Sequence, residues 1–128
     1  MKVSVIFKKK VEEKKQKITN DFIKLLQEIM PLKNDITIHF LGKRKENMTT
    51  GLEVNREIYT LYGNRILVDV LRTLCHEWTH CYQDENIEEK KDVNVPGKPL
   101  ENMSNVIAGA VVRYFTKSNP EIEKELFD

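Results

Sequence analysis

The segment from Arg65 to Asp84 constrains this chain most, because its apolar residues recur at the spacing of a helix. At about 100° per residue they fall on one arc, which predicts a buried helix face. The segment also contains two of the chain's three histidines, His76 and His80, which lie off that arc. The side that carries them is therefore available to line a cleft. The apolar arc consists of Leu67, Val70, Leu71, Leu74, Trp78, Cys81 and Tyr82.

The two histidines enclose a glutamate in the pattern His-Glu-x-x-His. Residues four apart on a helix differ by about 40° and one turn of rise, so both imidazoles can reach one ion. Neutral imidazole binds Zn²⁺ well, and catalytic zinc sites keep one position open. Glu77 lies beside the histidines, where its carboxylate can take a proton from water that the metal activates. Gln83 points the same way, and it either orients a ligand, contacts substrate or is solvated.

A site with two histidines requires a third protein ligand. The acidic candidates downstream are Asp84, Glu85, Glu88, Glu89, Asp92 and Glu101. The first two lie on or next to the same helix, and the next three lie in a polar loop. We favour Glu101, because a loop of this length lets a second helix return beside the first. Asn105 follows four residues later on the same face and can support a ligating histidine. His39, in a predicted strand, is the upstream alternative.

The remaining segments predict a small α+β fold. Residues that alternate or are rich in β-branched types predict strands, at residues 3–7, 35–41, 50–54 and 57–61. Helical spacing predicts helices at residues 12–30, 65–84 and 100–116, with a polar loop at 87–99. This order is typical of an N-terminal strand and helix, an antiparallel or mixed sheet of three to four strands, and two final helices. No repeat or linker divides the chain, so we expect one domain over residues 1–128.

Charge and cysteine content narrow the functional classes. Twenty-one Lys and Arg nearly balance 20 Asp and Glu, so nucleic acid is not the expected partner. No apolar run approaches the roughly 20 residues that span a bilayer, and no signal-peptide pattern begins the chain. Cys75 and Cys81 are too far apart on one helix for a disulfide. We therefore expect a cytoplasmic protein with two free thiols and no membrane partner.

Two motifs, His76-Glu77-Trp78-Thr79-His80 and Glu101-Asn102-Met103-Ser104-Asn105, together resemble the gluzincin clan of zinc metallopeptidases. The resemblance is to minimal relatives of thermolysin and to small phage- or mobile-element-borne enzymes, and it spans residues 57–115. It implies that His76, His80 and Glu101 bind zinc, that Glu77 is the general base, and that Asn105 occupies a support position. It also implies that an edge strand of the sheet receives an extended peptide.

The second motif departs from the pattern of the clan at two positions. Met103 stands where many small relatives have an acidic residue that can serve as the ligand, so Glu101 has to take that role. Asn105 stands where aspartate is usual, which makes the support neutral and weaker. The resemblance implies a zinc-dependent metallopeptidase that acts on a peptide or protein substrate. The alternative is a non-catalytic, zincin-like module that binds or regulates a protein partner.

Overall fold

The computed structural model describes residues 1–86 and 99–128, which form a mixed α+β fold. The elements in chain order are β1 (Val3–Phe7), α1 (Glu13–Ile29), β2 (Ile36–Leu41), β3 (Gly51–Val54), β4 (Glu57–Leu61), α2 (Leu67–Asn86), α3 (Pro99–Ser118), the 3-10 helix η1 (Pro120–Ile122) and α4 (Glu123–Phe127). The predicted order is confirmed as far as α3. The predicted polar loop, with its candidate ligands Glu88, Glu89 and Asp92, lies outside the described residues except for Pro99, which begins α3.

The four strands form one mixed sheet in the order β1-β2-β4-β3. β1 and β4 both run parallel to β2, whereas β3 pairs antiparallel with β4 as a hairpin. Asn55 and Arg56 connect that hairpin with φ values of 51° and 65°, as a two-residue type I′ turn requires. Of the two kinds of sheet expected from the sequence, the mixed one is present. β3 is an edge strand.

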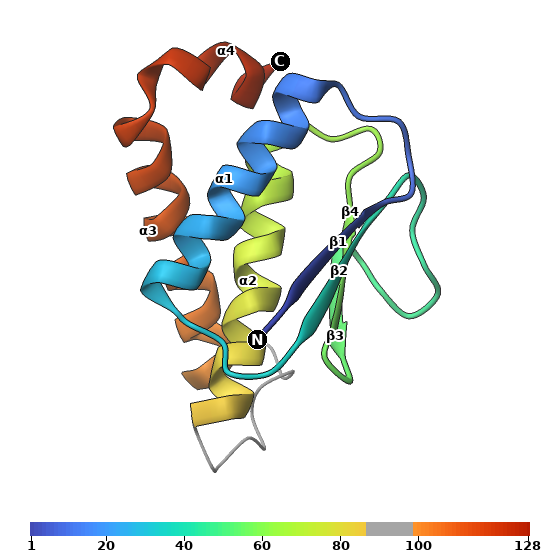
Figure 1. The fold of residues 1–128 in the computed structure, drawn as a ribbon, viewed down its shortest axis with the longest axis vertical. Coiled ribbons are helices and arrows are strands. Elements are labelled where there is room, and N and C mark those ends of the chain that lie inside the picture. Colours follow the sequence, from blue (N-terminus) through green and yellow to red (C-terminus); the bar gives the residue numbers. More distant parts are fainter. Residues whose placement is uncertain (87–98) are drawn as a thin grey trace.

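The core lies between the sheet and the helices, which gather on one side of it with α2 between the sheet and α3 (Figure 1). Ile36, Ile38 and Phe40 alternate along β2 and are buried in this core. The predicted apolar arc of α2 is also buried, apart from Tyr82, which is half-buried. Trp78 is fully buried, and its indole Nε1 donates a hydrogen bond of 2.9 Å to the Met30 carbonyl. The amphipathic pattern thus fixes which side of α2 faces the core, and the side that carries His76 and His80 faces the cleft.

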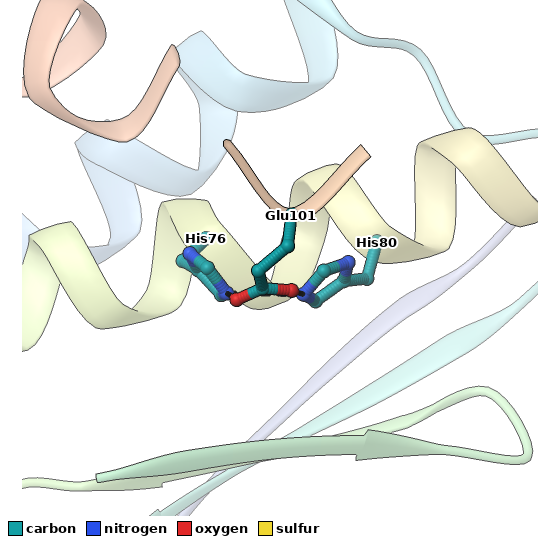
Figure 2. Close-up of side chains that lie close together, drawn as sticks. All are labelled: His76, His80 and Glu101. Atoms are coloured by element: carbon teal, nitrogen blue, oxygen red, sulfur yellow. Dashed lines mark hydrogen bonds and ion pairs between the residues drawn. The ribbon is translucent and has the colours of Figure 1, made fainter. Parts of the chain in front are cut away.

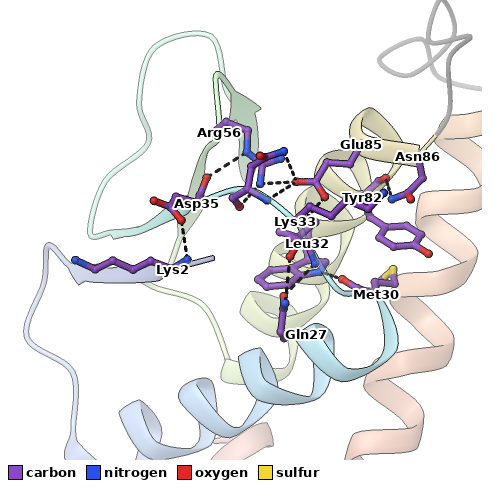
Figure 3. Close-up of polar contacts among 12 residues, drawn as sticks. Lys2, Gln27, Met30, Leu32, Lys33, Asp35, Arg56, Tyr82, Glu85 and Asn86 are labelled. Atoms are coloured by element: carbon purple, nitrogen blue, oxygen red, sulfur yellow. Dashed lines mark hydrogen bonds and ion pairs between the residues drawn. The ribbon is translucent and has the colours of Figure 1, made fainter.

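Glu85 anchors the C-terminal end of α2 to the sheet (Figure 3). Its carboxylate accepts hydrogen bonds from the backbone N–H groups of Lys33, at 2.6 Å, and Asn34, at 3.2 Å. The guanidinium of Arg56, in the β3–β4 turn, lies 2.8 Å from the same carboxylate. The last turns of α2 are therefore held to the segment before β2 and to the hairpin at once.

The C-terminal end of the chain folds back on the helices. Leu126 of α4 is fully buried in the core, and Glu125 lies 4.0 Å from Lys14 of α1. Neither η1 nor α4 was expected from the sequence. Within the described residues, no helix combines the length and apolar character that crossing a membrane requires.

Candidate metal centre

Three side chains from two helices converge in Figure 2. Oε1 of Glu101 lies 2.8 Å from Nε2 of His76, and Oε2 lies 3.1 Å from Nε2 of His80. The two Nε2 atoms are 3.0 Å apart. Within residues 1–86 and 99–128, these residues form a group whose potential ligand atoms all lie within 4.8 Å of one another. The structure thus brings together the three ligands expected from the sequence.

The donor set fits a metal ion. Two imidazole nitrogens and a carboxylate are typical zinc ligands, and zinc–nitrogen bonds of about 2.0–2.1 Å need such closely spaced donors. Oε2 of Glu101 is buried and accepts no hydrogen bond in the described part of the chain, although it lies 3.1 Å from Nε2 of His80. Coordination to a cation would satisfy this oxygen. Burial, and then the charge of His76, lowers the pKa of His80. His80 is therefore held in the neutral form that binds metal.

The packing of α3 on α2 places Glu101. Glu101 lies in the first turn of α3, where a carboxylate is favoured by the helix dipole. Further along α3, Ala108 and Val112 are buried, and the ring of Phe115 packs edge-to-face on Phe22 of α1 at 5.1 Å. This apolar face fixes the rotation of α3. The side chain of Glu101 is thereby directed between the two imidazoles of α2 (Figure 2).

Gln83 and Ser104 contact the other ring nitrogen of His80. Oε1 of Gln83 lies 3.3 Å from Nδ1 of His80, and Oγ of Ser104 lies 3.5 Å from it. The Ser104 hydroxyl also donates to Gln83 Oε1 at 3.4 Å, and both side chains are buried. An Nδ1–H that donates to Gln83 leaves the Nε2 lone pair directed at the metal position. Of the roles considered for Gln83, this geometry fits the orientation of a ligand.

The sequence favours Asn105 as the residue that supports a ligating histidine, whereas in the structure Ser104 makes this contact. Asn105 is exposed and lines the cleft beside the centre, whereas Ser104 contacts His80. The available signal was the spacing, because Ser104 is three residues after Glu101 and lies on the same helix face. The rotation of α3 determines whether the residue three or four positions after Glu101 contacts His80.

Glu77 lies beside the centre, as its position on the helix predicts. Its side chain is buried, with 9% of the residue exposed, and it lines the same cleft as His76 and His80. Burial, and then the charges of Glu101 and Glu53, raises the pKa of Glu77 to about 8. A divalent cation at the three ligand atoms would lower this pKa by direct attraction.

A cleft of about 430 Å³ opens onto these residues. β3 and the segment before it form one side, and the start of α3 contributes to the other. Its charged lining residues, apart from the histidines, are acidic. The lining consists of Asn47, Met48, Thr49, Thr50, Gly51, Leu52, Glu53, Thr73, His76, Glu77, His80, Glu101 and Asn105.

Two other candidates for the third ligand either lie away from the metal centre or have a side chain engaged in other contacts. His39 is on the sheet face that points away from the helices, where it stacks on Tyr59 at 4.6 Å. Its Nε2 lies 2.9 Å from Oε1 of Glu57. Glu85 is held by the anchor described above. Cys75 and Cys81 are buried free thiols, as expected, and burial raises the pKa of both.

Fold and site together define a small α+β protein with a two-helix candidate metal centre. Comparisons with protein-family models, with curated proteins and with solved structures find no match to this chain. The resemblance to gluzincins therefore stays a prediction that rests on the two motifs.

Proposed function

We propose that the protein is a zinc-dependent metallopeptidase of the gluzincin type. One observation carries the proposal: Glu101 of α3 lies against both histidines of α2, with Glu77 in the wall of the same cleft. Among the described residues, the cluster has three members. Three protein ligands are typical of catalytic zinc sites, which leave a fourth position for water or substrate.

The roles of the residues follow from their chemistry. A zinc ion at His76, His80 and Glu101 would supply the Lewis acidity that polarises the scissile carbonyl and makes water nucleophilic near neutral pH. Glu77 accepts a proton from the attacking water and passes it to the leaving amine. Gln83 and Ser104 hold the ring of His80 in one orientation.

The position of β3 supports a peptide substrate. β3 is the edge strand on the cleft side of the sheet, and Gly51, Leu52 and Glu53 line the cleft. An exposed strand edge can pair with an extended peptide through main-chain hydrogen bonds. A peptide added to β3 would run past Glu77 and the metal position.

The test is hydrolysis of a diverse peptide mixture by the zinc-loaded protein, followed by mass spectrometry. Wild type should give new termini, and Glu77→Gln should bind about one zinc per chain and lose at least about 100-fold of the rate. His39→Gln, outside the cleft, should cleave like wild type. Full activity of Glu77→Gln would refute the mechanism. A zinc-loaded wild type that binds peptides without cleaving any would instead support the non-catalytic binding module.

A further inference from the structure

Gly51 lies where β3 comes closest to Glu77. A Cβ atom at position 51 would lie 2.8 Å from Oε2 and 3.0 Å from Cγ of Glu77. It would also lie 2.6 Å from Cγ2 of Thr73, one turn earlier on α2. Separations below about 3.0 Å force neighbouring atoms to move. Glycine inside a strand often marks such a close approach.

The backbone conformation does not account for this glycine. The φ angle of Gly51 lies outside the left-handed region, and Gly51 pairs with Thr60 in regular antiparallel register. At a strand position of this kind, alanine is ordinarily better than glycine by about 0.5–1 kcal/mol. What glycine provides here is space on the cleft side of β3, where the Glu77 side chain lies.

Thr73 is the less movable of the two neighbours. Its Oγ1 accepts a hydrogen bond of 2.9 Å from Nη2 of Arg65, and Nη1 of Arg65 donates to the Leu61 carbonyl at 3.0 Å. Thr73 is buried, with 9% of the residue exposed. The Glu77 carboxylate is the far end of a flexible side chain. A side chain at position 51 would therefore displace the carboxylate, while its closer overlap with the fixed Thr73 would push the β3 backbone away from α2.

We propose that Gly51 is a positioning residue for Glu77. By lacking a side chain, Gly51 lets the carboxylate lie against β3 in the cleft that His76 and Glu101 also line. The catalytic consequence of this inference rests on the proposed function. Its structural part does not, because the placement of Glu77 can be measured in a protein without activity.

The structural arm compares crystal structures of zinc-loaded wild type, Gly51→Ala and a matched control. Gly109→Ala on α3 is that control, because a Cβ there meets nothing within 4 Å. In Gly51→Ala we expect a small shift of β3 that relieves the 2.6 Å approach to Cγ2 of Thr73, and a displaced Glu77 carboxylate. The three ligands should stay in place, with zinc affinity within about threefold of wild type. A carboxylate that keeps its position while β3 or Thr73 moves would overturn the proposal, whether or not the protein is a peptidase.

The kinetic arm asks whether position 51 acts through Glu77. Gly51→Ala should lower kcat by about 100-fold, the cost of a misplacement of about 1 Å, and Gly109→Ala should leave kcat unchanged. Added to Glu77→Gln, Gly51→Ala should change the residual rate less than twofold, because the group it displaces no longer acts as a base. An equal loss in both backgrounds would contradict the proposal.

If Gly51→Ala does not fold, the combination with Thr73→Ser provides the same test. Serine keeps the hydroxyl that Arg65 binds and removes Cγ2, the atom nearest to the added Cβ. The double variant should fold and still show a displaced Glu77 carboxylate. A double variant with the carboxylate in its wild-type place would refute the proposal.

Discussion

Oε1 of Glu101 lies 2.8 Å from Nε2 of His76, although the two residues belong to different helices and are separated by the undescribed segment 87–98. The contact depends on the rotation of α3, which its buried apolar face sets against α2 and α1. The proposed zinc centre is therefore a product of helix packing. A single helix carries only two of its ligands.

Removal of a ligand should abolish stoichiometric zinc binding. Glu101→Ala leaves two imidazoles, and affinity should fall by more than the roughly 10–100-fold that loss of a supporting residue costs. His76→Ala should behave alike. His39→Gln is the matched control, because His39 lies on the opposite face of the sheet and contacts Glu57. Isothermal titration calorimetry checks this, and equal zinc affinity of Glu101→Ala and wild type would exclude Glu101 as a ligand.

Loss of the residues that contact His80 should weaken zinc binding less than loss of a ligand does. Gln83→Leu removes the acceptor at Nδ1 of His80 with little change in shape, and Ser104→Ala removes the hydroxyl beside it. Each should weaken zinc binding by about 10–100-fold, as loss of a group that orients a ligand does. Asn105→Ala, which changes an exposed neighbour, should bind zinc like wild type. Competition with a chromophoric chelator measures all three, and the reverse ranking would assign the support to Asn105.

Glu53 predicts a pH-dependent stability. Burial, and then the charge of Asp84 and a hydrogen bond to it, raises the Glu53 pKa from 4.5 to about 7, although Cys81 and Arg56 lower it. The folded state therefore favours the protonated carboxyl. The contribution of the Glu53 carboxyl to the free energy of unfolding is full below pH 4.5, declines as the pH rises, and is lost above about pH 7. Glu53→Gln stays neutral, so its stability relative to wild type should increase from pH 5 to pH 8.

Urea unfolding at both pH values checks this expectation, with the zinc removed by chelator. After burial, the charge of Asp84 is the largest cause of the raised Glu53 pKa. Asp84→Asn removes this charge, so the pH dependence of stability should shift to lower pH in that variant. An identical difference between Glu53→Gln and wild type at pH 5 and pH 8 would contradict the assignment.

Glu85 predicts a loss of stability outside the cleft. Glu85→Ala leaves the N–H groups of Lys33 and Asn34 and the guanidinium of Arg56 without their carboxylate, and should cost about 1–3 kcal/mol. Glu28→Ala, on an exposed position of α1, should change the free energy of unfolding by less than about 0.5 kcal/mol. Urea unfolding measures both, and equal values would show that the anchor adds no stability.

Local periodicity explains how much of this structure was predictable. The apolar side of α2 and the position of His76 and His80 off that side follow from helical spacing, because one helix determines both. Glu101 was predictable as the acid at the start of the next helix. The contact of Ser104 with His80 was not, because it depends on how α3 is rotated against α2.

The arrangement of the strands in the sheet could not be predicted from local sequence patterns. Four strands were predictable from alternation, but the order β1-β2-β4-β3 follows from contacts between distant segments. The same applies to Gly51, whose neighbours Thr73 and Glu77 come from α2. A glycine within a strand is a signal that another segment comes close to it. That this segment is α2 could be recognised only once the position of β3 against α2 was known.

X-ray diffraction at the zinc absorption edge tests the central claim most directly. The account predicts one anomalous peak per chain, bound by Nε2 of His76, Nε2 of His80 and the Glu101 carboxylate, with a position open to the cleft. The absence of a peak from zinc-soaked crystals, or a peak closed off by a fourth protein ligand, would contradict it.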